Sequence, residues 1–271
     1  MTSPALQEIV ALLGCPAAGD PAQYLFERAI EAANLDWRFV TCDVAADDVA
    51  AALAGVAALG FRGCLLSGAI REPALTHVGT ASPSASFSGA VNLVERRDRG
   101  LVGHMTEGRG IVEALRGHVD PVARAAVVVG AGPRGRAVAL ELAAAGAGEL
   151  LIGDPDPVSA AAVVAALPSG VLATALDWRP MLVPPHAGIL VVTSGDGQPQ
   201  ASGLRPDLVV ADAVTAGSQS SLAAEAAAHG CCLVDGIEIH AVQAAIDFQT
   251  LTGLEADVDM LREALEEFLG A

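Results

Sequence analysis

Short apolar runs alternate along the chain with longer segments whose apolar positions recur at helical spacing. In the first part this pattern predicts strands at 9–14, 37–43 and 63–67, helices at 21–33 and 47–59, a mobile Ser-rich loop at 80–89, and a hairpin of 90–95 with 100–104. Further on it predicts strands at 127–129, 150–152, 171–175, 188–193, 208–211 and 231–234, and helices at 107–118, 136–146, 157–167, 219–229 and from 238 onward. Such alternation predicts an α/β fold of two lobes with parallel sheets and ligands at the carboxyl ends of the strands.

One strand-turn-helix-strand segment, 124–156, carries a G-x-G-x-x-G turn. Gly130 would make the tight turn, Gly132 would admit a pyrophosphate, and Gly135 would pack the helix on the strand. The second strand ends at Asp154, where a carboxylate can accept both ribose hydroxyls of NAD and would repel the 2′-phosphate of NADP. The segment therefore predicts a Rossmann-type unit that prefers NAD; the alternative is an α/β unit whose glycines only serve packing. The turn residues expected to bind the cofactor are Gly130, Ala131, Gly132, Pro133, Arg134 and Gly135.

The composition narrows the function further. A formal charge of −17 argues against nucleic acid, and no apolar run reaches the length of a membrane span. Five cysteines without C-x-x-C spacing, and an N-terminus without signal-peptide features, predict a reduced cytoplasmic protein without a metal site. The expected partner is a small-molecule substrate; the oligomeric state stays open, with a homodimer as one option. All fifteen basic residues are arginine, so no mechanism can use a lysine.

The stretch G-A-V-N at 89–92, followed by L-V-G-H-M-T-E-G at 101–108, resembles the G-A-V-N-T and L-x-G-Y-N-T-D-G motifs of the shikimate dehydrogenase family. The resemblance extends nearly end to end, through G-C-P at 14–16, D-G at 235–236 and Q-A-A at 243–245.

This resemblance implies a two-lobe oxidoreductase. Residues 1–105, with helices of 238–271 packing back on them, would bind a hydroxylated cyclohexene or cyclohexane carboxylate, and residues 106–237 would bind NADP or NAD. Hydride would pass between the nicotinamide and a secondary alcohol of a shikimate- or quinate-like acid.

In the family a lysine and an aspartate bracket the reacting hydroxyl, and here Arg71 and Glu107 stand in those places. An arginine cannot shuttle a proton near neutral pH, so Arg71 would act as an electrostatic clamp; a structural ion pair is its alternative role. Glu107 would stay ionised beside Arg71, or would only be a carboxylate at a helix start. His104 replaces a tyrosine and is the natural proton carrier, unless it is a solvated hairpin residue.

The resemblance also implies substrate contacts from Ser67, Asn92 and Gln243, and cofactor contacts from Thr193, beside Ser194, and from Gly236. Several positions depart from the family. The loop 17–21 lacks the two serines that hold the substrate carboxylate, and its Asp20 would repel an anion or cap a helix. Thr215 replaces a tyrosine, and Asp154 falls where NADP-dependent members have an arginine.

These departures leave more than one hypothesis. The leading one is an NAD-dependent oxidoreductase with a diverged substrate site. The alternative is a catalytically silent NAD-binding protein, such as a sensor or accessory subunit, suggested by the missing lysine and serines beside a retained cofactor loop. A folate or amino-acid dehydrogenase of similar build is a third reading.

Overall fold

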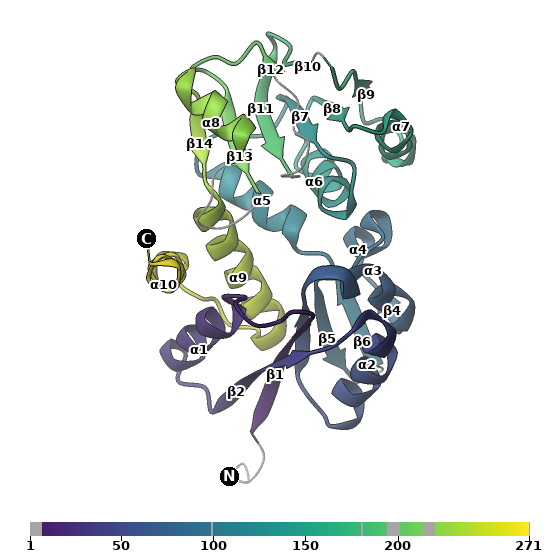
Figure 1. Ribbon diagram of the computed structural model, residues 1–271, viewed down its shortest axis with the longest axis vertical. Coiled ribbons are helices and arrows are strands. Elements are labelled where there is room, and N and C mark those ends of the chain that lie inside the picture. The colour runs from purple at the N-terminus through teal and green to yellow at the C-terminus, as the bar shows by residue number, and fades with distance from the viewer. Residues whose placement is uncertain (1–6, 99, 180, 194–200, 214–219, 271) are drawn as a thin grey trace. The chain divides into compact units, whose positions relative to one another are not determined.

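The computed structural model describes residues 7–98, 100–179, 181–193, 201–213 and 220–270 (Figure 1). Contacts within the chain divide it into two compact units. Unit 1 comprises 1–106 with 243–271, and unit 2 comprises 107–242. The boundaries fall one residue and five residues beyond those expected from the sequence, the second of them inside a continuous helix.

Unit 1 is built on a six-stranded sheet with the order β2-β1-β3-β5-β6-β4. β1 pairs in parallel with β2 and β3, whereas β5 pairs antiparallel with both β3 and β6. The sheet is therefore mixed rather than parallel, because the predicted hairpin inserts its first strand beside β3. The strands are β1 (Glu8–Gly14), β2 (Trp37–Asp43), β3 (Gly63–Leu66), β4 (Thr80–Ala81), β5 (Leu93–Arg97) and β6 (Gly100–His104).

The helices of unit 1 cover this sheet, with α1 lying against α10 (Figure 1). They are α1 (Ala22–Ala32), α2 (Val49–Ala58), α3 (Arg71–Ala74), α4 (Pro83–Ser88) and α10 (Val258–Leu269), with short 3₁₀ turns at Ala46–Asp48, Gly68–Ile70 and Leu75–His77.

The prediction of a loop at 80–89 is wrong, since this segment contains β4 and α4. Ser82 caps α4 by accepting a hydrogen bond from the Ala85 amide, and Pro83 occupies the first helical position. Gly89 ends the helix in the left-handed region at φ 78°. The start and stop signals were present in the sequence, but the serine content concealed them.

Unit 2 holds a second six-stranded sheet, in which all five pairings are parallel. Its order, β14-β13-β11-β7-β8-β9, places β7 between β11 and β8. The central strand β7 is fully buried and β11 is buried except at Gly188, as their apolar sequences favour. The strands are β7 (Ala125–Val129), β8 (Glu149–Gly153), β9 (Ala173–Leu176), β11 (Ala187–Val192), β13 (Val209–Asp212) and β14 (Cys232–Val234), with a separate pair of β10 (Met181–Leu182) and β12 (Ala201–Ser202).

The helices of unit 2 are α5 (Glu107–Arg116), α6 (Pro133–Ala144), α7 (Pro157–Ala166), α8 (Ser221–Ala228) and α9 (Gly236–Thr252), the last of which continues into unit 1. Of these, α6, α7 and α8 connect paired parallel strands, whereas α5 precedes β7 and α9 follows β14.

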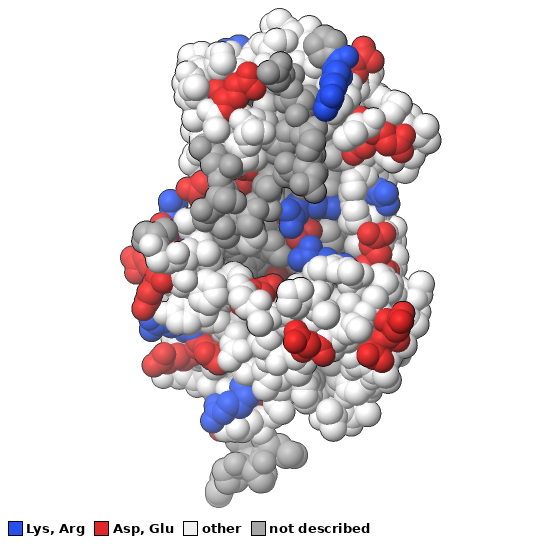
Figure 2. All heavy atoms as spheres, in the orientation of Figure 1, with Lys and Arg blue, Asp and Glu red and all other residues white. Residues whose placement is uncertain are grey.

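On the face shown in Figure 2, Asp and Glu side chains are spread over both units rather than gathered in one patch. In the part of the chain that the structure describes, no helix combines the length and apolar character that crossing a bilayer requires.

Candidate functional site

The glycine-rich turn of unit 2 joins β7 to α6. Gly130 adopts φ 108°, a conformation that favours glycine, and donates its amide to the Gly153 carbonyl at 2.8 Å. A side chain at Gly135 would collide with the Gly130 carbonyl oxygen, so this glycine allows α6 to start close to β7. Among the described residues, no atom lies within 4 Å of the place where a side chain at Gly132 would begin. The turn therefore leaves room at the N-terminus of α6, where backbone amides and the helix dipole suit a phosphate group.

Asp154 lies directly after β8 and faces this turn. Its carboxylate accepts hydrogen bonds from the Ala131 amide at 2.7 Å and from the Asp156 amide at 2.9 Å. Each carboxylate oxygen keeps a second lone pair for a ligand hydroxyl. Thr193, after β11, donates its hydroxyl to the Val129 carbonyl at 2.7 Å and so lies at the same edge of the sheet. Gly236, the first residue of α9, accepts a bond from the His240 ring at 2.6 Å.

Glu107 and Arg134 form an ion pair within unit 2. Glu107 begins α5, and its side chain is 4% exposed; Arg134 is in the first turn of α6, and its side chain is 25% exposed. Their Oε1 and Nη2 atoms lie 2.9 Å apart, and Nη1 of Arg134 donates to the Ala213 carbonyl at 2.6 Å. The Glu107 carboxylate raises the pKa of the Arg134 guanidinium. The partner of the predicted catalytic carboxylate is thus Arg134, which spacing in the sequence does not predict.

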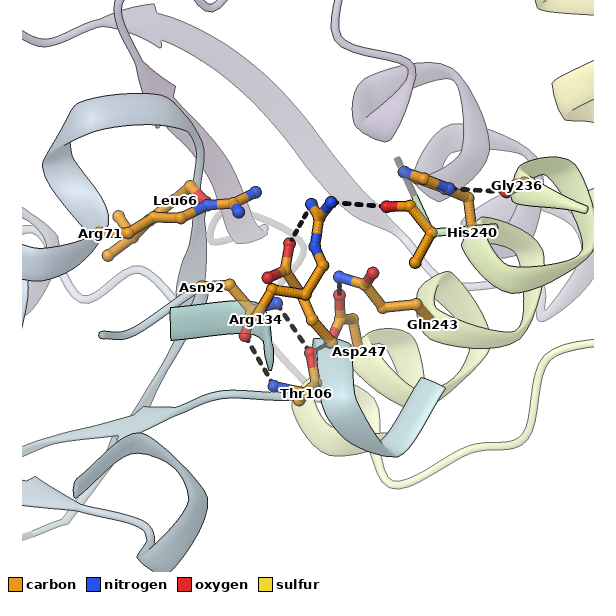
Figure 3. A network of polar contacts seen from close by, with 11 residues as sticks. Leu66, Arg71, Asn92, Thr106, Arg134, Gly236, His240, Gln243 and Asp247 are labelled. Atoms are coloured by element: carbon orange, nitrogen blue, oxygen red, sulfur yellow. Dashed lines mark hydrogen bonds and ion pairs between the residues drawn. The ribbon is translucent and has the colours of Figure 1, made fainter. Parts of the chain in front are cut away.

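A chain of hydrogen bonds links four polar residues of unit 1 (Figure 3). The Thr106 amide donates to Asn92 Oδ1 at 2.7 Å, which fixes the orientation of the Asn92 amide. Asn92 Nδ2 therefore donates to Thr106 Oγ1 at 2.7 Å, and the Thr106 hydroxyl donates its hydrogen to Asp247 Oδ1 at 2.6 Å. Gln243, one turn earlier on α9, points Nε2 at Asp247 Oδ2 at 3.5 Å.

The direction of this chain has a chemical consequence. The chain ends at Asp247, whose residue is 1% exposed and whose carboxylate accepts from the Thr106 hydroxyl and from Gln243 Nε2. Because Gln243 turns its nitrogen toward Asp247, it presents its carbonyl oxygen on the other side. Unit 1 thus offers a hydrogen-bond acceptor at Gln243 and the second amide hydrogen of Asn92, a combination suited to hydroxyl groups.

Arg71, Ser67 and His104 also belong to unit 1. Arg71 donates Nε to the Leu66 carbonyl at 2.9 Å, and its own carbonyl accepts from the Val91 amide beside Asn92. Ser67 Oγ fills the space that a side chain at residue 14 would need, which is why a glycine stands there. His104 Nε2 lies 3.2 Å from Glu95 Oε2 across the hairpin. Burial lowers the pKa of His104, and Glu95 partly offsets that effect.

Comparison with known proteins places this geometry in a family. No family model matches the chain. A shikimate dehydrogenase (NADP(+)) of Halobacterium salinarum is 34% identical over 264 residues, which cover 95% of this chain and 98% of that protein. The chain belongs to the shikimate dehydrogenase family.

Two solved structures of similar proteins support this membership. The 5-ketofructose reductase of Gluconobacter sp. strain CHM43 superimposes with a TM-score of 0.89 at 28% identity, covering 97% of this chain and 99% of that one. The quinate dehydrogenase from Corynebacterium glutamicum in complex with NAD gives a TM-score of 0.84 at 26% identity, with 96% and 99% covered. The predicted family, the α/β fold and the NAD(P)-dependent dehydrogenase class are confirmed.

The loop that precedes α1 differs from the shikimate dehydrogenase pattern in its chemistry. Asp20 accepts the Ala22 amide at 3.0 Å and so caps the start of α1. Asp43, at the end of β2, accepts the Ala17 amide at 2.7 Å. Loop 17–21 lacks the two serines of the family, and the two acids that accept its backbone amides, Asp20 and Asp43, disfavour an anion there.

Two residues of the unit 1 network were missed by the sequence analysis. Thr106 lies inside the stretch 101–108 that resembles a family motif, but roles were expected there only for His104 and Glu107. Asp247 had one available signal, since it is a lone acid between the apolar residues Ile246 and Phe248. Ser194 and Thr215 lie outside the described residues.

Proposed function

We propose that the protein catalyses hydride transfer between NAD and a secondary alcohol of a shikimate- or quinate-like cyclic hydroxy acid. Family membership supports the reaction class, and the observation that carries the dinucleotide site is the turn at Gly132, where no atom of the described residues fills the space beside the N-terminus of α6. The nicotinamide ring would supply or accept the hydride. The residues proposed to bind the dinucleotide are Gly130, Ala131, Gly132, Pro133, Arg134, Gly135, Asp154, Thr193 and Gly236.

The preference for NAD rests on Asp154. Its carboxylate is held beside the turn by two backbone amides, so its charge stays in place where a 2′-phosphate would approach. The relative from Halobacterium salinarum is named as NADP(+)-dependent, whereas the quinate dehydrogenase structure is a complex with NAD. The carboxylate of Asp154 favours NAD over NADP for this chain.

The proposed substrate residues divide the chemistry among them. Arg71 would hold the substrate carboxylate or stabilise a developing oxyanion, since its guanidinium stays charged throughout. Asn92 would donate its second amide hydrogen to a ring hydroxyl of the substrate, and Gln243 would accept a hydrogen bond from a ring hydroxyl through its carbonyl oxygen. Neither group is used in the network with Thr106 and Asp247. Glu107 would accept a hydrogen bond from the reacting alcohol, and His104 would carry the proton. We also propose a homodimer and a cytoplasmic location.

A second candidate function follows from the loop before α1. Because Asp20 and Asp43 face its backbone amides, unit 1 favours a substrate that is neutral at that end. The 5-ketofructose reductase shares 28% identity over nearly the full chain. Reduction of a ketone in a neutral polyhydroxylated compound is therefore the alternative.

One experiment separates these possibilities. Initial rates are measured by absorbance of the reduced nicotinamide, with shikimate, quinate and 5-ketofructose each combined with the appropriate form of NAD and NADP. Turnover of shikimate or quinate with NAD supports the proposal. Turnover of 5-ketofructose alone supports the second candidate function. Dinucleotide binding by calorimetry without any turnover would point to the silent NAD-binding protein.

The cofactor preference has its own test. Asp154→Asn should weaken NAD binding about tenfold and narrow the gap to NADP, because one or two charge-assisted hydrogen bonds are lost. Asp207→Asn, which removes an exposed acid of the same unit, is the control. Tighter binding of NADP than NAD by the unaltered protein would refute the preference while leaving the reaction class intact.

A further inference from the structure

The five cysteines of the chain differ in their surroundings. Cys64 is buried in the unit 1 sheet, and burial raises the pKa of its thiol. Cys231 is buried and donates to the Arg205 carbonyl. Cys15, Cys42 and Cys232 are exposed. Solvent reagents can therefore reach three thiols, of which one has a distinctive set of neighbours.

Cys232 lies beside a histidine that is itself held by a carboxylate. Its Sγ is 3.8 Å from Nδ1 of His118. On the other side of the ring, Nε2 of His118 lies 2.9 Å and 3.2 Å from the two carboxylate oxygens of Glu238. The side chains of His118 and Glu238 are 28% and 21% exposed, so water reaches the group without fully surrounding it.

The arrangement determines which ring nitrogen can accept a proton. A carboxylate accepts hydrogen bonds, so Glu238 requires a hydrogen on Nε2 of His118. In the neutral ring Nδ1 then carries the lone pair, and that lone pair faces the thiol. When Nδ1 takes the thiol proton, the resulting imidazolium is stabilised by Glu238. Cys232 is thus placed as a nucleophile, His118 as its base and Glu238 as the carboxylate that orients the base.

Each member of the group is positioned by the fold of unit 2. His118 follows the end of α5 and donates its amide to the Leu115 carbonyl. Glu238 is in the first turn of α9, where its amide donates to Asp235 Oδ1 at 2.8 Å. Cys232 is the first residue of β14.

The Cys232 thiol is separate from the glycine-rich turn, although Glu238 follows closely after Gly236, which is proposed to bind the dinucleotide. β14 is an outer strand of its sheet, with β13 and β11 between it and β7 (Figure 1). Cys232 lies at the amino end of β14, whereas the turn follows the carboxyl end of β7, and the sheet is parallel. The dinucleotide site therefore does not account for this thiol.

We propose that Cys232 is a modification site that reacts with low-molecular-weight disulfides. His118 Nδ1 takes the proton of the thiol, and the thiolate attacks one sulfur of the disulfide. A new bond forms between Cys232 Sγ and that sulfur while the original sulfur–sulfur bond breaks, and the leaving thiolate receives the proton from His118. One disulfide is exchanged for another, so no further oxidant is consumed.

The test measures the reaction of each cysteine in the full-length protein. Reduced protein is mixed with oxidised glutathione at pH 7, quenched by alkylation, and mapped by peptide mass spectrometry. Cys232 should form its mixed disulfide about tenfold faster than Cys15 and Cys42. His118→Gln should reduce the Cys232 rate to that of the other two, and Glu238→Gln should reduce it part of the way.

A matched control keeps this result specific. His186 and Glu149 form a similar pair in unit 2, 2.8 Å apart, so His186→Gln should leave the Cys232 rate unchanged. Circular dichroism checks the fold of each variant, and Glu238→Gln serves if His118→Gln does not fold. Equal rates at the three exposed cysteines, or an unchanged Cys232 rate in a folded His118→Gln or Glu238→Gln protein, would overturn the proposal. None of these readouts requires dehydrogenase activity.

Discussion

The contacts described for two buried carboxylates, Glu107 in unit 2 and Asp247 in unit 1, differ in kind. Glu107 is paired with a guanidinium, whose charge compensates its own. Asp247 accepts hydrogen bonds from the hydroxyl of Thr106 and the amide of Gln243. A cation lowers the cost of burying a charge, whereas hydroxyl and amide donors mainly fix which way each group points.

This difference separates two uses of a buried acid. The pair of Glu107 with Arg134 ties the first turn of α5 to the first turn of α6, where the glycine-rich turn ends. The network at Asp247 determines which atoms Asn92 and Gln243 present. We therefore expect the first carboxylate to matter most for stability, and the second for the recognition of a substrate.

Removal of the cation should give the largest effect. Arg134→Met keeps much of the side-chain length but leaves Glu107 buried without its guanidinium, and we expect a loss of about 3 kcal/mol in the free energy of unfolding. Urea titration measures it. Glu107→Gln added to Arg134→Met should recover part of the loss, because the uncompensated charge is gone.

Arg116→Met is the control for Arg134→Met, since Arg116 pairs with Glu113 on the surface of α5 at 3.6 Å. Its effect should stay below about 0.5 kcal/mol. A similar loss for both variants would mean that burial does not distinguish the two pairs.

Neutralising the second carboxylate should have a smaller effect on stability. In Asp247→Asn the Thr106 hydroxyl keeps an acceptor, but the new amide turns a donor toward Gln243 Nε2 and forces that side chain to rotate. We expect a loss of about 1–2 kcal/mol, the range for hydrogen bonds to charged groups. The KM for whichever substrate is turned over should rise more than kcat falls. Glu263→Gln, an exposed acid of the same unit, should change neither quantity, and an unchanged KM in Asp247→Asn would refute the orienting role.

The sequence could reveal features that backbone geometry imposes. Gly130 and Gly135 stand where a positive φ and a close helix contact demand glycine, and the strand before the turn is marked by its β-branched residues. The long helices and central strands were predicted for the same reason, because their apolar spacing repeats locally.

Contacts between distant side chains left no such local mark. Thr106 and Asp247 are separated by 141 residues, and Glu107 and Arg134 by 27, so neither pairing follows from spacing. The mixed sheet of unit 1 was missed for a related reason, since a hairpin prediction does not say which strand β5 will join. Only tertiary structure supplies that information.

The hairpin pair of His104 with Glu95 should give the smallest effect, visible as a dependence of stability on pH. Burial lowers the pKa of His104 in the folded protein below its unfolded value of about 6.5, so the unfolded chain binds more protons in that interval. The free energy of unfolding should therefore fall as the pH drops from 6.5 to the pKa of His104 in the folded protein. Below that pKa, His104 should cause no further change. Thermal unfolding between pH 8 and pH 5 measures the trend (about the range in which histidine titrates). His104→Gln should flatten the difference between the two ends, whereas His186→Gln, at an exposed pair, should not. A steeper fall in His104→Gln would mean that Glu95, and not burial, dominates the imidazole.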